Sequence, residues 1–170
     1  MQTVLYLVRH GETEDNARQI MQGQVQGNLN EKGWQQAAEV RDRMRHMAVD
    51  AIVASDLRRA IQTATVIAEP HGLKVDTTPL LRERDWGSFT GRYIPDLEHA
   101  VWPDDVEPLD CLLQRAQRFL EYMMTNYKGR TIIAVGHGIV NKAIQAVLLH
   151  KPMNEVKRMT NAEVREFCLS

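Results

Sequence analysis

Three short runs of apolar residues, spread along the chain and free of charged residues, constrain the fold more than any other feature. They are Val4–Val8, Ala51–Ala54 and Ile132–Val135. A strand that is apolar on both faces has to be covered on both faces, which is typical of parallel strands in the middle of a sheet. Two further short strands are predicted at Lys74–Thr78 and Val164–Leu169.

Between these runs lie segments with the period of amphipathic helices. In the clearest of them, Leu109–Tyr127, the residues Leu112, Ala116 and Phe119 fall on one apolar stripe. The other predicted helices are Glu31–Met47, Leu57–Ala68 and Ile139–Leu149. This alternation predicts an α/β fold, a three-layer sandwich in which helices flank a mostly parallel central sheet. We expect one domain over residues 1–170.

Composition limits the partners of such a domain. The chain has 21 Lys and Arg against 22 Asp and Glu, so no broad positive field exists for nucleic acid or an anionic membrane. No apolar stretch suits a membrane span, and the first eight residues are too short for a signal peptide. Cys111 and Cys168 lack the spacing of a metal site. We expect a cytoplasmic protein without nucleic-acid or membrane partners and without a metal or other cofactor; a homodimer is left open.

Basic residues and histidines follow the ends of the three apolar runs. Arg9 and His10 come after the first run, and Arg58 and Arg59 come after the second. His137 follows the third run, between two glycines. Open α/β sheets bind ligands at the carboxyl ends of their strands. Cations that meet there without matching carboxylates predict an anionic ligand, and phosphate suits the arginine fork. The periodicity does not decide which of the two adjacent arginines faces it.

Two connections are long for a compact domain, one from Arg9 to about Asn30 and one from Pro79 to about Pro108. Connections of this length are more often functional than accidental. The second contains four aromatic residues, Trp86, Phe89, Tyr93 and Trp102. They suit equally well a wall against the leaving group of a substrate and a small satellite core beneath the loop.

Four motifs together resemble the histidine phosphatase superfamily, also called the phosphoglycerate mutase-like family. They occur in the family's order and are Arg9–Asn16, Ser55–Ala64, Leu81–Gly87 and Gly136–Gly138. Each is weak alone, but together they extend over most of the chain. The resemblance implies the phosphoglycerate mutase-like variety of the α/β sandwich.

The resemblance also implies a covalent mechanism. His10 would attack phosphorus and form a phosphohistidine, which water then hydrolyses. Glu83 would act first as the general acid and then as the general base. From the residues alone, Glu83 also suits a surface carboxylate paired with Arg82 or Arg84.

The remaining site residues implied by the resemblance bind the substrate. Those assigned to the phosphate are Arg9, Arg59, His137 and Asn16. Gln22 and Gly23 correspond to the family's loop at the border of the pocket. From the residues alone, Asn16 also suits the cap of a short helix.

The sequence departs from the family's pattern at two places. The segment Gln26–Asn30 stands where the family often has an acidic residue followed by Pro-Leu-Thr, although Asn30 can still cap the next helix. Thr90 stands where the family has a glutamate, which questions the support behind Glu83. Neither change affects the predicted phosphate-binding residues.

The family contains both mutases and phosphatases, which share one centre. A mutase must shield its phosphohistidine from water, and the resembling mutases have a longer insertion after the general acid. Here the segment Arg84–Pro108 is short and mostly acidic, which makes it a poor trap for phosphoglycerate. We therefore expect a phosphomonoester hydrolase that acts on a small-molecule phosphate ester. A phosphoglycerate mutase is the alternative, and a non-catalytic phosphate-binding module comes third.

Overall fold

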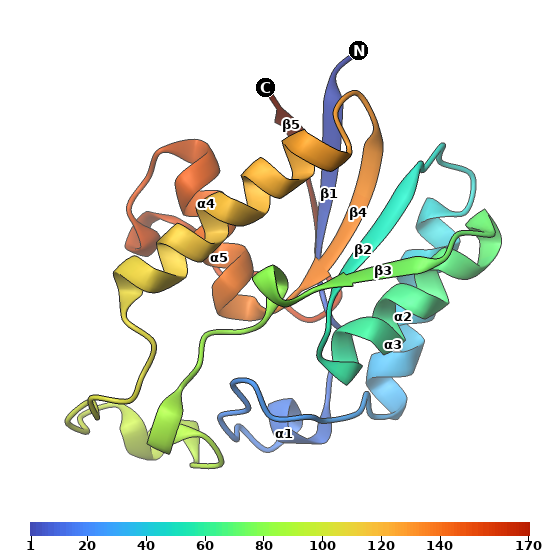
Figure 1. Ribbon diagram of the computed structural model, residues 1–170. Coiled ribbons are helices and arrows are strands. Elements are labelled where there is room, and N and C mark those ends of the chain that lie inside the picture. Colours follow the sequence, from blue (N-terminus) through green and yellow to red (C-terminus); the bar gives the residue numbers. More distant parts are fainter.

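The computed structural model describes residues 1–170 and contains one five-stranded sheet (Figure 1). Its strands are β1 (Thr3–Arg9), β2 (Ala51–Ser55), β3 (Val75–Thr78), β4 (Thr131–Gly136) and β5 (Val164–Leu169). They lie in the order β3-β2-β4-β1-β5, and only β5, at one edge, runs antiparallel to its neighbour. All five predicted strands and the mostly parallel sheet are confirmed.

The central strands are buried on both faces, as their apolar runs predict. In β4, Ile132 and Ala134 belong to one core cluster, whereas Ile133 and Val135 belong to the cluster on the opposite face. All four side chains are fully buried. Successive side chains of a strand point to opposite faces, so a run without polar residues is covered from both sides.

Helices form the two outer layers (Figure 1). The layers consist of α2 (Glu31–Met44), α3 (Arg58–Ala68), α4 (Leu109–Asn126) and α5 (Gly138–Leu149). The short α1 (Glu14–Ala17) lies outside both layers, in the connection that follows β1. The core clusters place α4 and α5 on one face of the sheet and α2 and α3 on the other. The α/β sandwich is therefore confirmed. No helix combines the length and the apolar character that crossing a bilayer requires.

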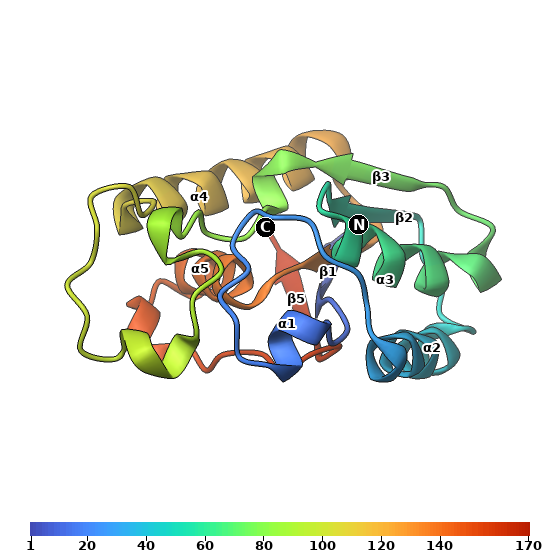
Figure 2. The ribbon, with the colours of Figure 1, turned by 90° about the horizontal axis from the view of Figure 1, so that it is seen from below.

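The register between the two innermost strands sets the position of the histidines. Arg9 of β1 lies opposite Gly136 of β4, so the chain leaves both strands at the same level with His10 and His137 side by side. The two long connections lie at this end of the sheet (Figures 1 and 2), and Figure 1 shows the two termini at the opposite end. A bridge between Ile20 and Tyr93 joins them.

Candidate active site

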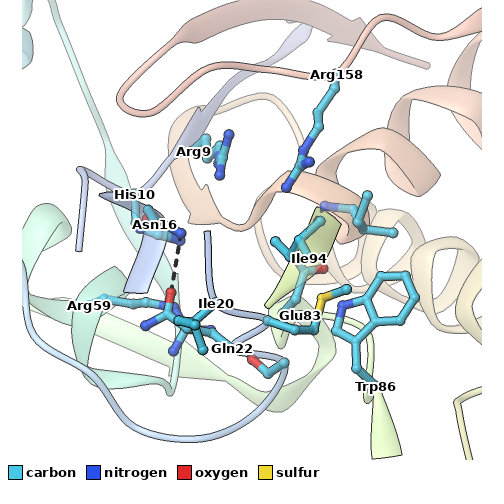
Figure 3. Close-up of a pocket in the computed structure, with 13 residues that line it drawn as sticks. Arg9, His10, Asn16, Ile20, Gln22, Arg59, Glu83, Trp86, Ile94 and Arg158 are labelled. Atoms are coloured by element: carbon cyan, nitrogen blue, oxygen red, sulfur yellow. Dashed lines mark hydrogen bonds between the residues drawn. The ribbon is translucent and has the colours of Figure 1, made fainter. Parts of the chain in front are cut away.

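A cavity of about 170 Å³ lies at this end of the sheet, and we call it the central cavity. Seven of the eight residues that the sequence assigns to the site line it: Arg9, His10, Asn16, Gln22, Gly23, Arg59 and Glu83. Figure 3 shows Arg9 and Arg158 on one side of it, with Arg59 and Gln22 on the opposite side. His137 is not a lining residue, but its ring centroid is 5.0 Å from that of His10.

His10 is held as a neutral ring with a defined tautomer. Its Nδ1 lies 2.6 Å from the carbonyl oxygen of Gly11, and because a carbonyl can only accept, Nδ1 carries the proton. Nε2 is therefore the unprotonated nitrogen, and it has no hydrogen-bond partner within the protein. Burial, and after it the charges of Arg59 and Arg9, hold the pKa of His10 well below its usual value.

His137 lies fully buried at the end of β4. Its Nε2 is 2.8 Å from the hydroxyl oxygen of Ser55, which follows from the position of Ser55 at the end of the neighbouring strand β2. Its Nδ1 is buried and has no partner within the protein. Burial, then the charge of Arg59, holds the pKa of His137 well below the usual value.

Arg9 and Arg59 are buried cations without a paired carboxylate. Arg9 donates to the carbonyl of Met159 at 2.8 Å, and Arg59 donates to the carbonyls of Gly23 and Val25 at 2.7 Å each. The Nε atoms of both arginines are buried without a partner. Burial, the largest cause, lowers the pKa of each guanidinium to about 10. Unpaired buried donors beside buried charges are costly, and an anion in the cavity would satisfy both.

The carboxylate of Glu83 is fixed at the first turn of α5. It accepts hydrogen bonds from the backbone N–H groups of Ile139 at 3.1 Å, Val140 at 3.0 Å and Arg84 at 2.8 Å. The first N–H groups of a helix lack partners within it, and the helix dipole favours negative charge there. Glu83 is thereby held in the wall of the central cavity.

The interpretation of Glu83 as a surface carboxylate is wrong. Glu83 is buried, and the side chains of Arg82 and Arg84 bind other residues. Arg82 forms a bidentate ion pair with Asp56, and the guanidinium of Arg84 donates to the carbonyl of Glu107. The support of Glu83 also owes nothing to position 90, because its hydrogen bonds come from α5 and from Arg84.

Asn16 takes part both in the start of α1 and in the wall of the central cavity. The residue that caps α1 is Thr13, not Asn16, but Asn16 completes the capping box from the third helical position, where its side chain accepts from the backbone N–H of Thr13. The same side chain lines the central cavity and donates to Gln22 at 3.3 Å (Figure 3). The cap therefore holds the amide in place beside Arg9 and His10.

The altered segment 26–30 packs onto α3 and α2. The side chain of Gln26 accepts from the first N–H of α3, at Arg58, and Asn30 caps α2 as predicted. Arg58 is exposed, whereas Arg59 is buried and lines the cavity. The choice between the two arginines, which periodicity left open, is thus decided by the structure.

The aromatic residues of the second connection divide between the two interpretations. Trp86 and Phe89 belong to a small satellite cluster with Leu97 and Val106. Of the four aromatic residues only Trp86 also lines the central cavity, and Trp102 packs against it edge-on with half of its surface exposed. The satellite-core interpretation is confirmed for Trp86 and Phe89. Of the four aromatic residues, Trp86 alone can form a wall against a substrate.

Two arginines of the site were not predicted. Arg115 of α4 donates to the carbonyls of Arg82 and Glu83 and pairs with Glu107 at 2.8 Å, so it holds the segment that carries Glu83. The sequence contains a signal for it, because a charged residue stands on the apolar stripe of that helix. Arg158, in the segment before β5, gives no such signal.

No three histidine, cysteine, aspartate or glutamate side chains lie close enough together to hold a metal ion. The candidate site consists instead of two histidines and two buried arginines from the ends of β1, β2 and β4, together with the carboxylate of Glu83 from the connection after β3. Cations gathered at the carboxyl ends of parallel strands are typical of the class of α/β proteins that bind ligands at this edge of the sheet.

Within this class the chain belongs to the histidine phosphatase superfamily, branch 1, whose family model matches residues 5–169. The resemblance stated from the motifs is confirmed. A probable phosphoglycerate mutase of Enterobacter sp. is 34% identical, and the match covers 91% of this chain and 79% of that relative. One from Yersinia pestis is 33% identical with the same coverage.

Solved structures of phosphatases are also similar. A mycobacterial glucosyl-3-phosphoglycerate phosphatase is 27% identical with a TM-score of 0.86, covering 98% of this chain and 90% of that one. A phosphoserine phosphatase from Entamoeba histolytica, in complex with 3-phosphoglyceric acid, is 26% identical with a TM-score of 0.86. That match covers 97% of this chain and 90% of the other.

Proposed function

We propose that this protein is a phosphomonoester hydrolase that works through a phosphohistidine at His10. One observation carries the proposal. The unprotonated Nε2 of a buried neutral histidine shares a cavity with two buried arginines and the carboxyl group of Glu83. These are the nucleophile, the charge-stabilising groups and the proton-transfer group that phosphoryl transfer needs.

In the first step, Nε2 of His10 attacks phosphorus while the bond to the leaving oxygen breaks. The guanidinium groups of Arg9 and Arg59, which line the cavity, stabilise the negative charge on the non-bridging oxygens. His137 joins them if the Ser55 hydroxyl donates to Nε2, because Nδ1 then carries the proton of the neutral ring. The carboxyl group of Glu83 gives its proton to the leaving oxygen.

In the second step, water replaces the histidine on phosphorus. Glu83, now ionised, takes a proton from that water as it attacks, and the Nε2–phosphorus bond breaks. Neutral His10, inorganic phosphate and the protonated carboxyl group are regenerated. The amide of Asn16 adds an uncharged contact at the cavity wall, and Gln22 and Gly23 complete the wall.

Access of water favours hydrolysis over mutase activity. The exposed side chains of Ile94 and Arg158 border the central cavity, so solvent reaches its mouth. The acidity of segment 84–108 does not contribute to the choice, because none of its acidic residues lines the cavity. Of the two reasons for expecting this segment to be a poor trap for phosphoglycerate, its acidity is therefore unsupported, and its short length remains.

The hydrolase proposal is tested with a panel of phosphomonoesters and a chelator. We expect phosphate release by the wild type that persists with the chelator and is abolished in His10→Ala. His99→Ala, a change on an exposed side chain, serves as the matched control. Undiminished release by His10→Ala would remove the nucleophile from the proposal. Binding of esters without any turnover would favour the non-catalytic phosphate-binding module.

The mutase alternative is supported by the names of the curated relatives. Mixing the protein with 3-phosphoglycerate and a trace of the 2,3-bisphosphate separates the two activities. We expect phosphate to appear without rapid formation of 2-phosphoglycerate. Fast isomerisation with no phosphate released would assign the protein to the mutases.

A further inference from the structure

Arg158 is the one arginine of the central cavity that no hydrogen bond or ion pair within the protein holds. Its side chain enters the cavity on the same side as that of Arg9 (Figure 3). The backbone around it is anchored, because Arg9 donates to the carbonyl of Met159 and Arg165 donates to that of Lys157, both at 2.8 Å. A fixed backbone thus presents a guanidinium without a partner.

The surroundings of this guanidinium are electrostatically unfavourable. It lies against the first residue of α5, where a Cβ atom on Gly138 would come within 2.9 Å of the Arg158 Nε. The start of a helix carries partial positive charge. The charge of Arg158 also contributes, after burial, to the lowered pKa of Arg9. An exposed arginine is free to turn away from such neighbours, so its place here indicates a negatively charged ligand.

A second hollow adjoins the central cavity at Arg158, and we call it the outer hollow. Its volume is about 410 Å³. It shares Arg9, Asn16, Ile94 and Arg158 with the central cavity but contains none of His10, Arg59 and Glu83. Its other polar lining residues are uncharged, namely Gln19, Thr160 and Asn161. Arg158 therefore stands between the reacting centre and a space for the rest of the substrate.

We propose that Arg158 and the outer hollow form a second anion subsite. It binds an acidic group, a carboxylate or a second phosphate, on the part of the substrate that leaves. The inference rests on the proposed phosphoryl transfer at His10, and it names the substrate class as small phosphomonoesters with a further negative charge. The transferred phosphate already has Arg9, Arg59 and His137, so Arg158 sets specificity rather than chemistry.

Binding to His10→Ala tests this subsite without any need for turnover. Calorimetry would compare inorganic phosphate, glycerol 3-phosphate, 3-phosphoglycerate and glycerol 1,3-bisphosphate. Adding Arg158→Gln should weaken at least one of the last two about tenfold or more, because a charge-assisted hydrogen bond is lost. It should weaken the first two by less than about threefold. Arg158→Lys should recover part of the loss, and Lys157→Gln, with the same charge change next door, should not weaken binding.

The esters identify the acidic group. A loss confined to 3-phosphoglycerate assigns a carboxylate, and a loss confined to the bisphosphate assigns a phosphate. Equal weakening of all four ligands would show that Arg158 holds the transferred phosphate, which overturns the subsite. No weakening, or no preference of the protein for either doubly acidic ester over glycerol 3-phosphate, overturns it as well. A wild type that binds these esters but hydrolyses none would contradict the proposed function alone.

Discussion

The free energy of unfolding should fall steeply as the pH drops from 7 to 5.5, because two histidines are buried as neutral rings. Burial and the nearby arginines hold the pKa of His10 and His137 well below the value of about 6.5 that each has in the unfolded chain. Below pH 6.5 the unfolded chain therefore takes up two protons that the folded protein does not. This stability is complete above pH 6.5 and is lost below it.

The size of the loss follows from the unfolded state. At pH 5.5 a histidine with a pKa of about 6.5 is stabilised in the unfolded chain by RT ln 11, or about 1.4 kcal/mol. Because both rings stay neutral in the folded protein, the free energy of unfolding falls by about 2.8 kcal/mol at pH 5.5, which is a large share of the stability of a domain of this size.

Urea unfolding in phosphate-free buffers between pH 5.5 and 8 measures this loss. His10→Gln and His137→Gln should each remove about 1.4 kcal/mol of the difference between pH 8 and pH 5.5. His99→Gln, a change on a side chain that is 91% exposed, should leave the difference as it is. The reasoning is refuted if either buried-site variant keeps the full pH dependence of the wild type. Carboxylates that also titrate cancel in these comparisons.

Three further changes probe the site. Glu83→Gln should lower kcat for alkyl phosphates about 10²-fold to 10⁴-fold. The loss should be much smaller for p-nitrophenyl phosphate, because its leaving group needs no proton. Equal losses of kcat for both esters in steady-state assays would show that Glu83 is not the general acid. Arg115→Met should lower the free energy of unfolding in urea by about 3 kcal/mol, because Glu107 keeps a mostly buried charge without its partner. Adding Glu107→Gln should recover part of that loss, and no recovery would contradict the pairing. Trp86→Ala should raise KM severalfold and Trp102→Ala should leave KM unchanged, because only Trp86 lines the cavity. A larger rise in KM for Trp102→Ala than for Trp86→Ala would contradict the assignment of Trp86 to the cavity wall.

Much of the architecture could be predicted from local pattern. Residues close together in the chain form the apolar runs of β1, β2 and β4 and the apolar stripe of α4. These patterns can therefore be recognised in the sequence without knowledge of the fold. The motif around His10 could also be found, because its residues are contiguous. The carboxyl ends of parallel strands meet at one edge, which is why the predicted cations converge.

Other features depend on contacts between distant segments, which no local pattern contains. Glu83 becomes a cavity residue because the N-terminus of α5 binds its carboxylate, and Arg115 reaches that segment from α4. Arg158 enters the site only because the antiparallel edge strand β5 brings the preceding segment against the end of β1. The position of His10 could thus be predicted from neighbouring residues, whereas Arg158 was placed beside it by packing between segments that are more than a hundred residues apart in the chain.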